Sequence, residues 1–385
     1  MKRTTLILAV ALCAVAFSAN AQVKEDFVPS TTVQSGKKFP AVNSDRCVRV
    51  QVTAPDAQSV KLDIGSVKYD LTKGENGVWT GESAPQDEGF HYYHIIVDGA
   101  TIPDPTALYY YGSGHWTSGV EVPAYDDDFY AVKNVPQGQV REMFYWSESC
   151  KSMLRCFVYT PEEYEYNLNK RYPVLYIQHG GGENEYGWAS QGKVAQIMDN
   201  LIAEGKALPF IVVMACSDVP APQAERPAGR PAGGFSMANF GAAYDKVLVE
   251  ELIPTIDKTF RTIKDNGHRA MAGLSMGGMI TKMVTLKHPD VFSNIGIFSG
   301  GTITVADADR TPGFRETNKV VFVGFGSREL ENRVPGFGDG TDPKEETEEV
   351  KASGVNAHFY VSPGTAHEWL TWRRCLYQFA QLLFK

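Results

Sequence analysis

Residues 273–277 have the sequence Gly-Leu-Ser-Met-Gly and match the pattern G-x-S-x-G, which holds a serine at a sharp turn between a strand and a helix. A strand-like apolar run precedes the motif at residues 269–274, and a helix-like run follows it at residues 276–288. The flanking glycines let the backbone turn without a side-chain clash. A serine hydroxyl is a poor nucleophile until a base takes its proton. The motif therefore predicts that Ser275 is a nucleophile whose base and acid come from other parts of the chain.

A histidine downstream of Ser275 is the expected base, because the chain order found with this motif is serine, acid, histidine. His367 lies in a loop between the last predicted strand and the last predicted helix. His288 ends a helix before Pro289 and is typical of a cap, and His358 lies inside a strand pattern. Functional loops of a doubly wound sheet lie at the carboxyl ends of the strands. We therefore predict that His367 and Ser275 share one edge of a sheet and that His367 is the base.

The acid is expected after the penultimate strand, where it would orient the histidine and stabilise its charged form. Glu329 follows the strand-like run at residues 320–325 and is the first candidate. Asp339, in the glycine-rich stretch 336–340, is the reserve candidate. The alternative for Glu329 is a surface charge beside its neighbour Arg328.

Negative charge that develops on an ester carbonyl needs two backbone N–H donors, which together form an oxyanion hole. One donor should be the residue after the nucleophile, Met276. The second should come from the His-Gly-Gly-Gly stretch at residues 179–182, which follows the apolar run 174–178. Within that stretch Gly181 is the first prediction and Gly182 the next.

The elements that must position these residues fall into two halves. Residues 45 to 125 alternate apolar and polar positions in short runs separated by turns, which predicts an immunoglobulin-type β-sandwich. From about residue 140, apolar strand-like runs alternate with helical stretches, which predicts a mostly parallel sheet covered on both faces. The fold class is therefore α/β, preceded by an all-β domain. The predicted strands of the second half are 174–178, 211–214, 270–274, 295–298, 320–325 and 358–361, and the predicted helices are 190–204, 239–258, 276–288, 343–353 and 368–384.

The first residues predict an exported protein. A basic start, an apolar run at residues 6–17 and an Ala-Asn-Ala site at 19–21 form a cleavable signal peptide, so we expect a secreted or periplasmic chain. The predicted divisions are 1–21 signal peptide, 22–130 β-sandwich, 131–142 linker and 143–385 catalytic domain.

Composition excludes several functions. The chain has 385 residues with 37 Lys+Arg and 45 Asp+Glu, a net charge of −8. This balance argues against binding nucleic acid through phosphate contacts or an anionic membrane through a basic patch. No later apolar run is long enough to insert into a membrane. Five of the six cysteines follow the signal peptide, and a Cys150–Cys156 bridge or two buried thiols both fit their spacing. No zinc-ligand spacing occurs, so we predict neither a metal nor a cofactor.

The second half resembles the esterase-D-like α/β hydrolases of carbohydrate esterase family 1, the secreted feruloyl and acetylxylan esterases. Four stretches carry the resemblance: 176–188, 251–257, 269–278 and 367–372. The family implies a serine and histidine at Ser275 and His367 and oxyanion donors in the two loops named above. The family usually has an aspartate where Glu329 stands, and this departure puts the assignment of Glu329 as the acid in question. For substrate contacts we assign Trp188, with Glu183 and Asn184.

The first half resembles the immunoglobulin-like modules related to family 48 carbohydrate-binding domains, through residues 77–80, 89–94, 97–99 and 104–105. The two resemblances together imply a secreted serine esterase that removes feruloyl or acetyl groups from plant cell-wall xylan and its oligosaccharides. The proline-rich stretch 219–234 and Trp188 are candidates for the acyl or sugar pocket, and packing beneath the site is the alternative for Trp188.

Two other functions stay open. An enterochelin-type siderophore esterase also joins a β-domain to this fold and would offer cations to an anionic catecholate, and Arg226 and Arg230 are such cations. A polysaccharide-binding protein with a weakened esterase domain is the third hypothesis. It rests on Glu329 and on the aromatic residues 109–111 and Trp116, for which packing at a domain interface is the alternative.

Overall fold

The computed structural model describes residues 23–220, 241–331 and 342–385. The predicted signal peptide, Asp339, Arg226, Arg230 and most of the proline-rich stretch lie outside these ranges.

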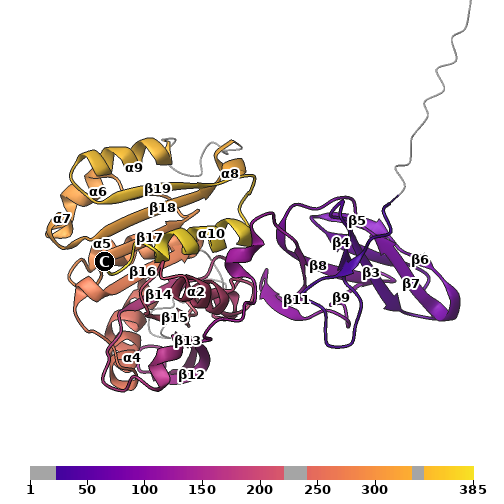
Figure 1. The fold of residues 1–385 in the computed structure, drawn as a ribbon, viewed down its shortest axis with the longest axis horizontal. Helices are drawn as coiled ribbons and strands as arrows, with labels where there is room; N and C mark the ends of the chain where they lie inside the picture. Colours follow the sequence, from indigo (N-terminus) through magenta and orange to yellow (C-terminus); the bar gives the residue numbers. More distant parts are fainter. Residues whose placement is uncertain (1–22, 221–240, 332–341) are drawn as a thin grey trace, which may run out of the picture.

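The amino-terminal half forms two antiparallel sheets, which we call the β-module (residues 28–122; Figure 1). The first sheet has the order β1-β2-β3-β7-β6, with bounds Val28–Pro29, Ala41–Val42, Val48–Thr53, Val78–Glu82 and Thr72–Lys73. The second has the order β10-β11-β8-β4-β5, with β9 paired to β8. Its bounds are Tyr109–Gly112, His115–Val122, Gly89–Val97, Val60–Ile64, Val67–Asp70 and, for β9, Ala100–Ile102.

Period-two alternation builds this module. In β4, Val60, Leu62 and Ile64 are buried while the residues between them are partly exposed. These side chains share one core with Val50 and Val52 of the other sheet, so the two sheets pack face to face. A two-residue turn joins β8 to β9 with positive φ at Asp98 and Gly99, as the Asp-Gly pair predicts.

The carboxyl-terminal half is built on one eight-stranded mixed sheet of order β12-β13-β15-β14-β16-β17-β18-β19. The first three strands pair antiparallel, and the remaining pairs are parallel. The bounds are β12 Gln139–Ser147, β13 Ser152–Thr160, β14 Val174–Gln178, β15 Ile211–Ala215, β16 Arg269–Leu274, β17 Asn294–Phe298, β18 Val320–Gly326 and β19 Ala357–Ser362. The predicted mostly parallel sheet is confirmed, and each predicted strand lies within one residue of an observed one.

Helices cover both faces of this sheet (Figure 1). One face packs on α2 (Val194–Ala203) and α10 (Trp369–Ala380). The other packs on a continuous helical stretch of α3 (Ala242–Lys246), the π-helix η6 (Val247–Leu252) and α4 (Ile253–Thr259), and on α5 (Met276–Lys287). On the same side lie α6 (Val305–Arg310), α7 (Phe314–Thr317) and α9 (Pro343–Ala352). Shorter elements are α1 (Tyr186–Ala189), α8 (Ser327–Glu331) and the 3-10 turns Glu75–Gly77, Asp127–Tyr130, Glu162–Glu165 and Asn266–His268.

Two features of the second half differ from prediction. The linker predicted at 131–142 ends inside β12, which begins at Gln139 and pairs with β13. The predicted strands also omit β12 and β13. In β12, Phe144 is 57% and Trp146 51% exposed, so one face of this strand is open, unlike the fully buried strands that the sequence predicts. None of the helices in the described ranges combines the length and apolarity needed to cross a bilayer. Cys150 and Cys156 are both free thiols.

The β-module packs directly on the second half through β8, β10 and β11, with β6 and β7 at its far side (Figure 1). Phe90 and Tyr110 of the module belong to the same buried core cluster as Trp369 and Leu370 of α10. The interface therefore continues the core of the larger half.

Candidate active site

Ser275 lies between β16 and α5, at the carboxyl end of a central strand. Its φ of 51° and ψ of −119° are a strained conformation for a residue with a side chain. The turn depends on glycine, because a Cβ added to Gly277 would lie 2.4 Å from the His179 carbonyl oxygen. The Ser275 N–H donates to the Phe298 carbonyl at 2.7 Å, which ties the turn to β17.

His367 lies between Ser275 and Glu329. Its Nε2 is 2.9 Å from Ser275 Oγ, and its Nδ1 is 2.6 Å from Glu329 Oε1. A neutral imidazole carries one proton, and a carboxylate beside Nδ1 places it there. Nε2 is then left to accept the serine proton. The three predicted residues thus meet with the spacing of a nucleophile, its base and an orienting acid.

Glu329 is held by donors on its second oxygen. Its Oε2 accepts hydrogen bonds from Ser299 Oγ at 2.8 Å and from the Gly326 N–H at 2.6 Å. Ser299 Oγ in turn accepts the indole N–H of Trp372 at 3.1 Å. The Glu329 side chain is 13% exposed and that of His367 is 51% exposed, so the acid is shielded while the base is open.

Ser299 is a site residue that no sequence motif indicates. It follows β17 directly and opens the Ser-Gly-Gly stretch 299–301. A polar residue at the carboxyl end of a buried strand next to the nucleophile strand was the available signal.

The two predicted oxyanion loops lie against each other. A Cβ added to Gly181 would be 3.1 Å from Met276 Sδ, and one added to Gly180 would be 3.4 Å from Ser275 Cβ. Met276 is the first residue of α5, where N–H groups have no partner within the helix. Gly182 lies further out, with a φ of 73°, and its carbonyl accepts the Gly114 N–H at 2.7 Å.

His179 is a structural residue of the oxyanion loop. It is 2% exposed, and burial lowers its pKa. Its Nε2 accepts the Ser217 N–H at 3.0 Å, which places the ring proton on Nδ1, 2.8 Å from the Gly180 carbonyl oxygen. The ring therefore ties the loop to the end of β15.

The three predicted substrate residues lie in different surroundings. Trp188 is 1% exposed, and its indole N–H donates to the Gln178 carbonyl at 2.8 Å. This burial favours the alternative given above for Trp188, in which the large indole packs in the core beneath the site. Asn184 Oδ1 accepts the Tyr186 N–H and caps a turn. Glu183 is partly buried and contacts the β-module, as described below.

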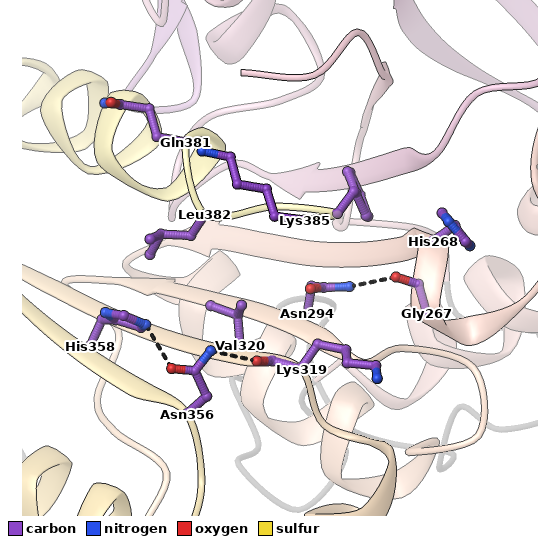
Figure 2. Close-up of a pocket in the computed structure, with 11 residues that line it drawn as sticks. Gly267, His268, Asn294, Lys319, Val320, Asn356, His358, Gln381, Leu382 and Lys385 are labelled. Atoms are coloured by element: carbon purple, nitrogen blue, oxygen red, sulfur yellow. Dashed lines mark hydrogen bonds between the residues drawn. The ribbon is translucent and has the colours of Figure 1, made fainter. Parts of the chain in front are cut away.

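One cavity, of about 460 Å³, lies at the amino ends of the central strands, whereas Ser275 follows the carboxyl end of β16 (Figure 2). Its lining includes His268, Asn294 and Lys319, which flank the amino ends of β16, β17 and β18. A second cavity, of about 340 Å³, includes Glu185 and Cys216 and lies at the carboxyl edge beside the oxyanion loop. Within the described ranges, no three His, Cys, Asp or Glu side chains cluster as metal ligands would.

The α/β sheet and the residues at its carboxyl edge are those expected of a hydrolase, and comparison with known families shows an esterase. The model of the family described as "Putative esterase" matches residues 147–382. The chain belongs to this esterase family, whose members are carboxylic ester hydrolases.

A curated relative aligns with a larger part of the chain than the family model does. The "Endo-1,4-beta-xylanase/feruloyl esterase" of Xylanibacter ruminicola is 45% identical over 378 residues, which cover 95% of this chain and 48% of the relative. The chain thus spans about half the length of that relative.

Solved structures show the same fold. The feruloyl esterase of Anaeromyces mucronatus, in complex with ferulic acid, has a TM-score of 0.56 at 20% identity, covering 68% of this chain and 96% of that one. The enterobactin esterase of Shigella flexneri has a TM-score of 0.59 at 16% identity, covering 87% of this chain and 92% of that one. At these identities the likeness extends to the fold alone.

Proposed function

We propose that this protein is a serine esterase that hydrolyses feruloyl esters of arabinoxylan, with Ser275, His367 and Glu329 as its catalytic residues. The observation that carries the proposal is the hydrogen-bonded series from Ser275 Oγ through His367 to Glu329. The X. ruminicola relative, whose name includes both xylanase and feruloyl esterase, supports the substrate class.

Acylation begins when Ser275 Oγ attacks the ester carbonyl and His367 Nε2 takes its proton. Glu329 stabilises the resulting imidazolium through Nδ1. The N–H groups of Gly181 and Met276 bind the oxyanion of the tetrahedral intermediate. His367 then gives its proton to the sugar oxygen, which leaves as an alcohol, and the feruloyl group stays on Ser275.

Deacylation repeats these steps with water. His367 removes a proton from water, and the hydroxide attacks the acyl carbonyl. The same N–H groups bind the second oxyanion. Ser275 recovers its proton as ferulate departs, so the cycle consumes one water and uses no redox step.

The β-module brings aromatic side chains to the same edge of the molecule. Tyr110 is buried at the interface, whereas Trp116 is 46% exposed and lies edge-on to Tyr186 of α1, with ring centroids 5.0 Å apart. An exposed indole beside the oxyanion loop is suited to stacking on a sugar ring. We include in the proposal that the module is an immunoglobulin-like carbohydrate-binding domain and that the chain is exported after loss of residues 1–21.

Two other acyl groups require testing. Acetyl esters of xylan use the same chemistry with a smaller acyl pocket. Catecholate esters are the second candidate, because the fold of the enterobactin esterase is shared over 87% of this chain and so does not separate the two substrate classes.

A substrate panel separates these possibilities. The full chain is assayed on methyl ferulate, feruloylated arabinoxylan, acetylated xylan and a linear catecholate ester, with product detected by chromatography. The proposal expects the highest kcat/KM on the feruloyl substrates. Preference for the catecholate would contradict it, and binding of xylan without turnover of any ester would favour a polysaccharide-binding protein.

A further inference from the structure

The β-module contacts the oxyanion loop at its backbone. The turn between β10 and β11 donates the Gly114 N–H to the Gly182 carbonyl at 2.7 Å. The approach is close, because a Cβ added to Gly182 would lie 3.1 Å from Ser113 Cα. One side of the loop is therefore fixed by a different half of the molecule.

Tyr92 of β8 makes a second contact through its side chain. Its hydroxyl is 3.0 Å from Glu183 Oε1, and it accepts hydrogen bonds from Gln191 Nε2 at 2.7 Å and Trp369 Nε1 at 3.2 Å. A tyrosine hydroxyl has one proton and two lone pairs. Because the two N–H donors occupy the lone pairs, the proton is directed to Glu183, which is closer than the Tyr111 carbonyl at 3.3 Å.

Glu183 connects Tyr92 to the oxyanion loop, residues 179–182. Its Oε2 accepts the Gly180 N–H at 3.4 Å, and its own N–H donates to the Gly180 carbonyl at 3.3 Å. These two bonds close the turn 180–183. Gly181, the proposed oxyanion donor, lies inside this turn.

We propose that Tyr92 is a positioning residue for the oxyanion hole, acting through Glu183 to hold the turn that presents the Gly181 N–H. The inference rests on the proposed ester hydrolysis and extends it: the β-module supports transition-state binding in addition to any role in holding glycan. Tyr92 touches neither Ser275 nor His367 in the described contacts, so its effect passes through the loop.

The test uses Tyr92→Phe in the full chain, with Tyr110→Phe as the matched control. Both substitutions remove one hydroxyl at the module interface, but Tyr110 faces Glu121 and Arg373 instead of Glu183. Two rates are measured: kcat for methyl ferulate, and the rate at which a fluorophosphonate modifies Ser275. In the second reaction an O–P bond forms, fluoride leaves, and the phosphoryl oxygen occupies the oxyanion hole.

We expect Tyr92→Phe to lower both rates about fivefold to twentyfold with KM within about twofold, which is less than the loss from deleting a donor outright. Tyr110→Phe should leave both rates within about twofold. Glu183→Ala should lower both rates at least about fivefold, and adding Tyr92→Phe to it should cause less than about a twofold further change, because both act on one loop.

Unchanged rates in Tyr92→Phe, or losses that multiply in the double variant, would overturn the proposal. If Tyr92→Phe does not fold, Glu183→Ala decides alone, and unchanged rates in it refute the positioning role. A wild-type chain that reacts with the fluorophosphonate but not with feruloyl esters would refute the proposed substrate and still permit this test. A wild-type chain inert to both would refute both proposals.

Discussion

Glu329 stands where the family usually has an aspartate, and the structure shows how a longer side chain fits. One carboxylate oxygen reaches His367 Nδ1, and the other accepts the Ser299 hydroxyl and the Gly326 N–H. A carboxylate with donors on both oxygens is fixed in orientation, which is what an acid needs to hold one tautomer of the base. The glutamate is therefore placed to serve as the proposed acid.

Replacing Glu329 by Gln tests this assignment. The amide cannot stabilise an imidazolium and favours the wrong tautomer of His367, so kcat for methyl ferulate should fall about 10²-fold to 10⁴-fold. Asp339→Asn, at the reserve candidate, is the matched control and should retain wild-type kcat. The reverse pattern would assign the acid to Asp339.

Glu183 adds a pH dependence of stability. Burial raises its pKa from 4.5 to about 7 in the folded chain. Between these values the folded chain holds a proton that the unfolded chain has lost, so this residue's contribution to stability is greatest at low pH and is lost as pH rises through about 7.

Glu183→Gln cannot ionise and should remove this pH dependence. Relative to wild type, the variant should therefore become more stable, with a larger free energy of unfolding in urea, as pH rises from about 5 to about 8. Glu345→Gln, at an exposed position of α9, is the control and should show no such trend. If the free energies of unfolding of wild type and Glu183→Gln differed by the same amount at every pH, the raised pKa of Glu183 would be contradicted.

At the scale of elements, the site is an assembly of loops at the carboxyl ends of strands. β14 leads to the oxyanion loop, β16 to Ser275, β18 to Glu329 and β19 to His367. The strand-to-helix turn at Ser275 leaves no room for a side chain at Gly277, which packs against the backbone of the oxyanion loop.

Gly277→Ala should disrupt this assembly. The added carbon would lie 2.4 Å from the His179 carbonyl oxygen, so the elbow or the oxyanion loop must move. We expect kcat to fall at least about tenfold and the unfolding free energy to fall by about 1–3 kcal/mol. In the control, Gly267→Ala, the nearest atom is the flexible Asp265 Oδ1 at 3.1 Å, and a small effect is expected. Full activity in Gly277→Ala would show that the turn is not so constrained.

The sequence predicts those elements whose signal is local. Buried parallel strands such as β14 and β16 are continuous apolar runs, and the elbow carries its glycines, so both were found. The short helix α8, which carries Glu329, has no apolar face long enough to be periodic. The sequence does not show which side of the sheet a loop residue faces, so it does not distinguish a substrate contact at Trp188 from packing in the core. The link from Tyr92 to Glu183 joins residues 91 positions apart and has no local signal.

At the scale of the whole molecule, buried charge joins the two halves. Arg373 of α10 has a fully buried side chain and donates to both carboxylate oxygens of Glu121 on β11, at 2.6 and 3.0 Å. Its Nε donates to the Gln191 carbonyl at 2.7 Å. Removing one partner of such a pair leaves an uncompensated charge in the core.

Glu121→Gln should therefore destabilise the chain by about 3–5 kcal/mol in urea unfolding. Replacing both partners, in Glu121→Leu with Arg373→Met, should cost less than the single change, since no charge is left unpaired. Lys61→Met, in an exposed pair with Asp70, is the control and should cost about 0–1 kcal/mol. Equal losses of unfolding free energy in Glu121→Gln and Lys61→Met would contradict a buried interface between the β-module and the second half.

The proposed hydrolysis of feruloyl esters by Ser275 is measured as release of ferulate from feruloylated arabinoxylan by wild type and by Ser275→Ala. Chromatography measures the ferulate, and circular dichroism checks that the variant is folded. We expect rapid release by wild type and a loss of at least about 10³-fold in the folded variant. Release at similar rates by both proteins, or by neither, would contradict it.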